Sequence, residues 1–249
     1  MQNLNYGVIG NCSTAALISE KGAIEWLCFP EFDSPSVFAA ILDRQKGGHF
    51  GFKVTSDYKV TQSYVPHTNI LSTHFESEEG AFDVVDFMPC YPTSDGKDFY
   101  RPAEIYRYIR WAKGRPRMKV DYRPAPNYAR GKTIYNVTSQ YVETYSSAKN
   151  KDRQYLYSSL DLKKVVNHDE ITLEKDEFFL FSFNEKVIPV DIEREKLEYC
   201  RTLVYWLNWT DHAKRYTRYN EVIERSMLVL KLMTYRNGAV MAAVTTSLP

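Results

Sequence analysis

Residues 14–29 read TAALISEKGAIEWLCF, and this stretch predicts a β-hairpin. Its two halves, residues 14–19 and 23–29, are rich in strand-forming side chains, and Glu20, Lys21 and Gly22 lie between them. A glycine supplies the backbone conformation that so tight a connection needs. A hairpin this early in the chain favours an antiparallel sheet protein.

Strand patterns dominate the chain from residue 49 to residue 184. We expect strands at residues 49–54, 58–65, 69–76, 81–88, 105–111, 117–123, 133–137, 140–145, 154–159, 170–173 and 178–184. Short strands separated by turn pairs such as Glu79-Gly80 predict an antiparallel sandwich, not alternating βαβ units. The 14% of aromatic residues agrees, because Tyr and Phe favour strands.

One short helix is expected inside this β region. Ser34 suits an N-cap, and Pro35 suits the first helical position, where its missing N–H costs nothing. The helix would run to about Leu42 and end before Gly47-Gly48.

The pattern changes near Val190, which we take as the end of the sandwich (residues 1–190). Residues 193–216 predict an amphipathic helix, because Leu197, Cys200, Val204 and Leu207 recur at helical spacing. This segment, 191–217, would link the sandwich to a second helix at residues 219–235.

Residues 227–233 of that second helix are apolar almost all round, and such a helix needs burial on every side. Two helices beside a sheet cannot provide this, and the last five residues, TTSLP, read as an interrupted loop. We therefore expect residues 218–249 to begin a further domain of a longer polypeptide. Burial against a second copy, a homo-oligomer, is the alternative.

Charge and composition exclude several partners. The chain of 249 residues has 32 Lys and Arg against 31 Asp and Glu. Residues 101–132 are locally basic, but residues 161–198 hold eleven acidic residues against six basic ones. We expect the two regions to neutralise each other across strands, and we expect no nucleic-acid partner.

The compartment is inferred from the chain's beginning, its apolar runs and its cysteines. The longest apolar run, residues 239–244, is too short to cross a membrane, and the first six residues carry no secretion signal. Four cysteines without a CxxC pair suit a reducing compartment. We expect a cytoplasmic protein with no membrane partner.

No self-contained catalytic motif is present. The nucleotide, zinc-protease and esterase signatures are all missing, and the five histidines share no metal-ligand spacing. We therefore expect no catalytic residue, no metal and no cofactor within this chain.

Asp83 and Asp86 lie three residues apart on one expected strand, so their side chains face opposite sides of the sheet. The side chain that faces inward should accept a hydrogen bond from a backbone donor.

Several consecutive strings resemble the family 15 glycoside hydrolases, which include bacterial glucoamylases, glucodextranases and related trehalases. The strings are IGNCSTAALIS at 9–19, GAIEWLCFP at 22–30, FDSPSVF at 32–38, VDFMP at 85–89, and residues 226–249. The resemblance implies a super-β-sandwich, a linker helix and the first helix of an (α/α)6 barrel. It also implies inverting hydrolysis of α-glucosidic bonds by two barrel glutamates located after Pro249. Asn11 and Ser13 stand where relatives often carry Asp and Arg, so a loop contact with the barrel can differ here.

Four residues are the candidates for proximity to substrate: Trp26, Phe29, Phe32 and Asp33. The three rings offer flat apolar faces to a sugar, and Asp33 precedes the expected cap with its carboxylate free. In the alternative interpretation, Trp26 and Phe29 are core residues, and Asp33 stabilises the N-terminus of the expected helix.

The resemblance therefore implies a non-catalytic N-terminal domain that packs against its own barrel and helps to shape the site for an α-glucoside. The chain alone is expected to be inactive. A stand-alone carbohydrate-binding or scaffold sandwich is the alternative.

Overall fold

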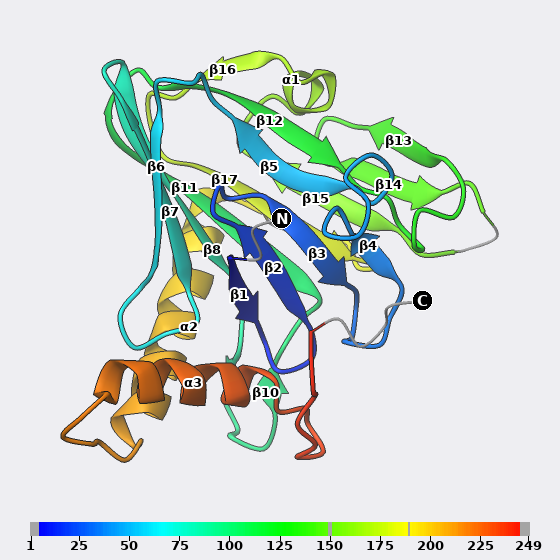
Figure 1. Cartoon of the computed structure of the whole chain (residues 1–249). Coiled ribbons are helices and arrows are strands. Elements are labelled where there is room, and N and C mark those ends of the chain that lie inside the picture. Colours follow the sequence, from blue (N-terminus) through cyan, green and yellow to red (C-terminus); the bar gives the residue numbers. More distant parts are fainter. Residues whose placement is uncertain (1–4, 149–150, 189, 245–249) are drawn as a thin grey trace.

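Two antiparallel sheets lie face to face in this computed structural model, which describes residues 5–148, 151–188 and 190–244 (Figure 1). The first sheet, sheet A, has the spatial order β1 (Tyr6–Gly10), β2 (Ala15–Ser19), β3 (Ile24–Cys28), β5 (His49–Lys53), β12 (Arg117–Arg123), β16 (Glu170–Thr172), with β4 (Ser36–Phe38) paired to β3. Sheet B has the order β13 (Thr133–Val137), β14 (Val142–Ser146), β15 (Gln154–Ser158), β17 (Glu177–Phe183), β11 (Glu104–Gly114), β8 (Gly80–Phe87), β7 (Leu71–Ser77), β6 (Lys59–Tyr64). The expected sandwich is confirmed.

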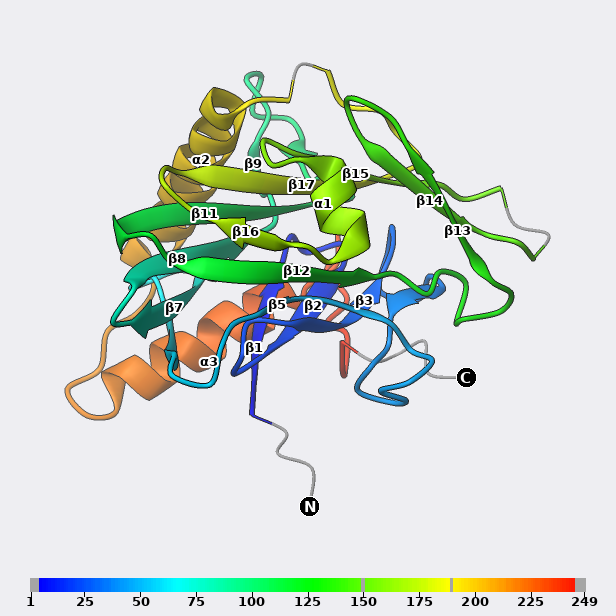
Figure 2. The ribbon, with the colours of Figure 1, turned by 90° about the horizontal axis from the view of Figure 1, so that it is seen from above.

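Two short strands and three helices complete the described structure. The strands β9 (Tyr91–Pro92) and β10 (Phe99–Tyr100) form a small separate hairpin, and α1 (Leu162–Asn167) lies beside β12. Two longer helices follow the sandwich, α2 (Ile192–Asp211) and α3 (Asn220–Leu232). Figure 2 shows α2 on the outer side of sheet B, while α3 runs beneath the first strands.

The first hairpin is confirmed. The strands β2 and β3 pair antiparallel, and Gly22 takes the positive φ of +74° that the turn requires. A strand that we did not predict, β1, pairs with β2 from Tyr6 to Gly10 and extends the hairpin to three strands.

The expected helix at residues 34–42 is wrong. Residues 36–38 form β4, in which Phe38 pairs with Leu27. Instead of capping a helix, the Ser34 hydroxyl accepts a hydrogen bond from the Glu31 N–H at 3.1 Å. Val37 and Phe38 are buried in the core, and their burial between the sheets outweighs the local N-cap pattern.

Aromatic rings fill the space between the sheets. Phe75 stacks on Phe82 with centroids 4.7 Å apart, and Phe50 meets Tyr122 edge to face at 5.2 Å. Such pairs stabilise a core beyond the area that they bury. The high aromatic content of the sequence therefore serves the sandwich interior.

Asp83 and Asp86 face opposite sides of sheet B, as expected. Asp86 is fully buried between the sheets, but its partner is a side chain and not the backbone donor that we expected. Arg107 Nε donates to Asp86 Oδ1 at 2.7 Å, and Arg107 Nη1 donates to the Phe50 carbonyl of sheet A at 2.6 Å. The ion pair lies within sheet B, and the second hydrogen bond of Arg107 ties it to sheet A.

Both C-terminal helices are confirmed, although α2 ends at Asp211 and not at Tyr216. The apolar stripe that suggested α2 faces outward: Leu197, Val204 and Leu207 are 48%, 63% and 39% exposed, and Cys200 is exposed too. The buried face carries Glu195, Glu198, Thr202, Tyr205, Trp206 and Thr210 instead.

The second helix is only partly covered. In α3, Leu228 and Leu232 are buried, but Leu230 is 57% exposed, so burial on every side is not reached within the described residues. The expected loop at residues 245–249 lies outside the described residues, as do residues 1–4.

The expected neutralisation of residues 101–132 by residues 161–198 is found only in part, because several of the basic residues pair instead with carboxylates of β7 and β8. Arg115 pairs with Glu174 at 2.6 Å, and Arg117 pairs with Glu170 at 3.4 Å. Among the described residues, no helix combines the length and apolar character needed to traverse a lipid bilayer.

Candidate functional site

Two loops are held together at one end of sheet A, close to the C-terminal end of α3. The Asn11 side chain accepts hydrogen bonds from the backbone N–H groups of Ser13 and Thr14 at 3.1 and 3.2 Å and donates to the Pro102 carbonyl at 2.8 Å. The Ser13 carbonyl accepts from the Phe32 N–H at 3.0 Å. An asparagine amide suits this position, because it supplies both the acceptor and the donor.

Three of the four candidate residues are covered by protein. Trp26 is fully buried, and its indole Nε1 donates to the Val244 carbonyl at 2.8 Å. Phe29 is 1% exposed and stacks on Phe181 with centroids 5.9 Å apart, and Phe32 is 2% exposed. The described structure offers none of these ring faces to a sugar.

Asp33 is the exposed member of the four. It precedes a strand and not a helix, so the alternative role at a helix N-terminus has no helix to act on. Next to it, Glu31 accepts a hydrogen bond from the Tyr235 hydroxyl at 2.5 Å and pairs with Arg236 at 3.4 Å. Burial, the Glu31 carboxylate and the charge of Asp33 all raise the pKa of Tyr235. The loop therefore presents a polar edge beside the chain that follows α3.

The thiol of Cys12 ties α3 to the same end of the sandwich. It donates to the Lys231 carbonyl at 3.4 Å. A hydrogen bond from the Cys90 thiol lowers the pKa of Cys12 to about 7, and the same contact raises that of Cys90. Cys12 and Cys28 are buried, and none of the four cysteines forms a disulfide.

A groove of about 1490 Å³ lies between α2, α3 and the β9–β10 hairpin. Its walls are mainly apolar and include Tyr91, Phe99, Val204, Trp209 and Met227. The sequence pattern does not reveal this groove, because the β9 and β10 strands are only two residues long. The turn residues Ser94, Asp95 and Gly96 were the available signal for that hairpin.

The buried face of α2 carries a carboxyl group that the sequence analysis also missed. Glu195 is 1% exposed, and no described group bonds to its Oε1 atom. Burial, and then the charges of Asp86, Glu104 and Glu198, raise the pKa of Glu195 well above its usual range. Folding therefore favours the uncharged form of this carboxyl group relative to its ionised form.

Within the described ranges, no group of three or more His, Cys, Asp or Glu side chains is placed to hold a metal ion. All five histidines are hydrogen-bonded: His67 to Glu224, His74 to Asp83, His49 to Asp121, and His168 and His212 to backbone carbonyls.

Comparison with known proteins matches residues 5–150 to the family model described as "Trehalase-like, N-terminal". A trehalase of Thermoplasma acidophilum is 30% identical over 243 residues, which cover 94% of this chain and 40% of the relative. A trehalase of Thermoplasma volcanium is 29% identical over 98% of this chain and 40% of its own length. Trehalase 1 of Sulfolobus acidocaldarius is 51% identical over 85 residues, 33% of this chain and 14% of the relative. The chain spans about 40% of the length of the first two relatives.

Proposed function

Because this chain belongs to the trehalase-like, N-terminal family, we propose that it is the non-catalytic N-terminal part of an enzyme that hydrolyses α-glucosidic bonds. The resemblance to family 15 glycoside hydrolases and the relatives called trehalases support this proposal. The substrate of the whole enzyme would be trehalose or a related α-glucoside.

The observation that carries the proposal is the outward apolar face of α2 beside the α2–α3 groove. Leu197 and Val204 point away from the sandwich, although both are apolar. Contiguous exposed apolar surface marks a place where another protein surface packs. We assign this place to the helical barrel of the same enzyme, with α3 as the first barrel helix.

The catalytic acid and base would belong to that barrel. Inverting hydrolysis needs a protonated carboxylic acid and a carboxylate base about 6.5–9.5 Å apart, with room for a water molecule. The sandwich would hold and shape the barrel, with the Asp33 loop at its mouth. The four free cysteines support a reducing, cytoplasmic location.

Two measurements test the proposal. The purified chain should release no glucose from trehalose, maltose or isomaltose above a no-protein control, because both carboxyl groups of the mechanism would be missing. Glucose release by this chain would contradict a non-catalytic role. A reading frame that ends with residue 249 would favour the alternative, a stand-alone carbohydrate-binding or scaffold sandwich.

The packing itself can be tested in a longer polypeptide that contains the barrel. Val204→Asp should weaken the contact between sandwich and barrel and lower the activity and the melting temperature. Val137→Asp is the matched control, because Val137 is also exposed but lies on β13, the edge strand of sheet B farthest from α2 in Figure 2. Equal effects of the two changes would refute the assignment of α2 to the barrel contact.

A further inference from the structure

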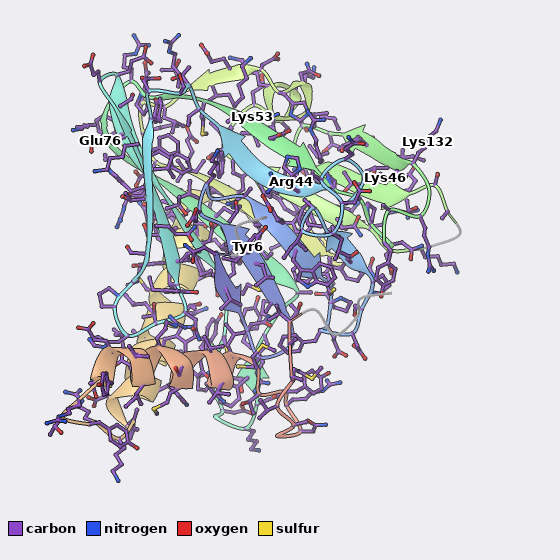
Figure 3. All side chains as sticks on the ribbon, viewed as in Figure 1. Tyr6, Arg44, Lys46, Lys53, Glu76 and Lys132 are labelled. Atoms are coloured by element: carbon purple, nitrogen blue, oxygen red, sulfur yellow. The ribbon has the colours of Figure 1, made fainter. Side chains whose placement is uncertain are left out.

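A second, polar hollow of about 490 Å³ lies on the outer face of sheet A, away from α2 and α3. Small residues leave the space: a Cβ atom on Gly51 would lie 2.8 Å from the Cβ of Ala23. Figure 3 shows Tyr6, Arg44 and Lys53 around this part of the sheet. The volume lies within the range of small-molecule sites.

One wall of the hollow is organised by Asp121, which is 4% exposed. Its carboxylate receives hydrogen bonds from His49 Nε2 at 2.8 Å, Lys53 Nζ at 2.7 Å and Arg123 Nε at 2.6 Å. Burial alone would raise the pKa of Asp121, but these three donors hold it well below its usual range. Lys53 carries three N–H donors and directs one of them to Asp121, so its ammonium group can also serve a ligand.

Tyr6 and Glu25 also line the hollow. The Tyr6 hydroxyl donates to Glu25 Oε2 at 2.5 Å, and burial together with this contact raises the pKa of Tyr6 to about 12. The phenol therefore stays protonated, and Glu25 keeps its second oxygen as an acceptor. Lys21 and Arg44 add exposed cations at the rim.

The lining balances its charges. Three carboxylates (Glu20, Glu25, Asp121) and three permanently charged cations (Lys21, Arg44, Lys53) surround the space. A charged ligand would be attracted by the groups of opposite charge and repelled by the groups of like charge. A hydroxyl group both donates and accepts, so several hydroxyls on one neutral molecule can use both sets together.

We propose that this hollow binds a neutral mono- or disaccharide, separately from any catalytic site. Glu25 accepts from sugar hydroxyls, Arg44 and Lys53 donate to them, and the half-buried Tyr6 ring packs against the apolar side of the sugar. The proposal does not depend on the glycosidase assignment, because it concerns binding by this chain alone.

Chemical-shift titration of the isotope-labelled chain tests the proposal. Trehalose, maltose and glucose are the sugar probes, and inorganic phosphate is the probe for an anion site. At least one sugar should shift the backbone signals of residues in β3 and β5, with a dissociation constant in the millimolar range. Phosphate should leave these signals in place.

Arg44→Ala should weaken sugar binding about tenfold or more, which is the usual effect of losing a hydrogen bond from a charged group. Lys46→Ala is the matched control, because Lys46 is an exposed cation of the same loop but does not line the hollow (Figure 3). Glu25→Gln, which keeps the shape of the side chain, should also weaken binding. The melting temperature of each variant verifies that it is folded.

Three outcomes would overturn the proposal. The first is that none of the three sugars perturbs these signals. The second is that phosphate perturbs them and the sugars do not. The third is that Arg44→Ala and Lys46→Ala bind sugar equally well. Activity of a longer polypeptide enters none of these outcomes, so failure here leaves the proposed function standing.

Discussion

The sandwich interior and the layer beneath α2 bury polar groups in opposite ways. Between the sheets, Asp86 and Arg107 are fully buried and bond to each other and to the backbone. Beneath α2, Glu195 is equally buried, but its Oε1 atom has no partner among the described groups. Meanwhile Leu197 and Val204 of the same helix face outward. The Asp86–Arg107 pair is satisfied by its neighbours, whereas the helical layer keeps polar surface inside and apolar surface outside, as expected of an element that contacts two neighbours.

The largest effect should come from breaking the interior ion pair. Asp86→Ala leaves the Arg107 guanidinium buried without its carboxylate, and such a loss costs about 3–5 kcal/mol of unfolding free energy. Asp83→Ala is the control on the outer face of the same strand, where Asp83 pairs with the exposed Arg110 at 3.1 Å. That change should cost no more than about 1 kcal/mol. Equal urea midpoints for the two variants would contradict the contrast.

Substitution in the contact between α2 and the sandwich should lower the unfolding free energy by a similar amount. Trp206 is 1% exposed, and Trp206→Ala should cost about 3–5 kcal/mol through the cavity it leaves. Leu197→Ala, on the outward face of the same helix, should change the unfolding free energy by less than about 0.5 kcal/mol in this chain. Denaturant unfolding followed by circular dichroism measures both. A costly Leu197→Ala would mean that this face is already covered.

The buried carboxyl of Glu195 should make stability depend on pH. Its raised pKa means that the unfolded chain loses this proton near pH 4.3, before the folded chain does. Its contribution to stability is therefore complete below about pH 4 and declines as the pH rises towards the folded-state pKa. Glu195→Gln removes this decline, so the unfolding free energy of the variant should increase relative to that of the wild type as the pH rises.

Unfolding free energies measured between about pH 4 and about pH 7 check this prediction. Glu193→Gln, at an exposed position on the same helix, is the control and should show a constant difference from the wild type. A constant difference for Glu195→Gln as well would show that Glu195 ionises normally.

Asp33→Asn should have the smallest effect on stability. Asp33 is exposed and precedes a strand, so the unfolding free energy should change by less than about 0.5 kcal/mol. If the side chain bonds a sugar hydroxyl or orients a barrel residue, kcat/KM of the longer enzyme should fall about ten- to a hundredfold. Unchanged kinetics would remove Asp33 from the substrate site.

The local sequence pattern was sufficient to predict strands and turns whose structure depends on residues close together in the chain. The strands β12 and β13 begin and end at the predicted residues, and the hairpin turn at Gly22 is where its glycine indicated. Tertiary packing decided the failures. Residues 36–38 carry a helix-start pattern but are drawn into the core as a strand, and no local pattern distinguishes the two.

At the candidate site, too, the local sequence pattern predicted some features, whereas features set by tertiary packing were missed. The exposure of Asp33 was predicted, but the burial of Trp26 and Phe32 depends on contacts with residues far along the chain. Periodicity identified α2 but not the side that faces the sandwich, because Glu195 and Glu198 resemble surface residues in sequence. The partner of Asp86 was missed for a similar reason: Arg107 lies on a different strand.

The bond between the Trp26 indole and the Val244 carbonyl joins residues 218 positions apart, and Tyr235 reaches back to Glu31 across 204. The segment that holds Trp26 and Glu31 is therefore completed by residues that are synthesised more than 200 positions later. Such non-local closure slows folding, since the chain must lose most of its conformational freedom before these contacts form. Until then the Trp26 N–H lacks its partner, and the hairpin is exposed to premature association during synthesis.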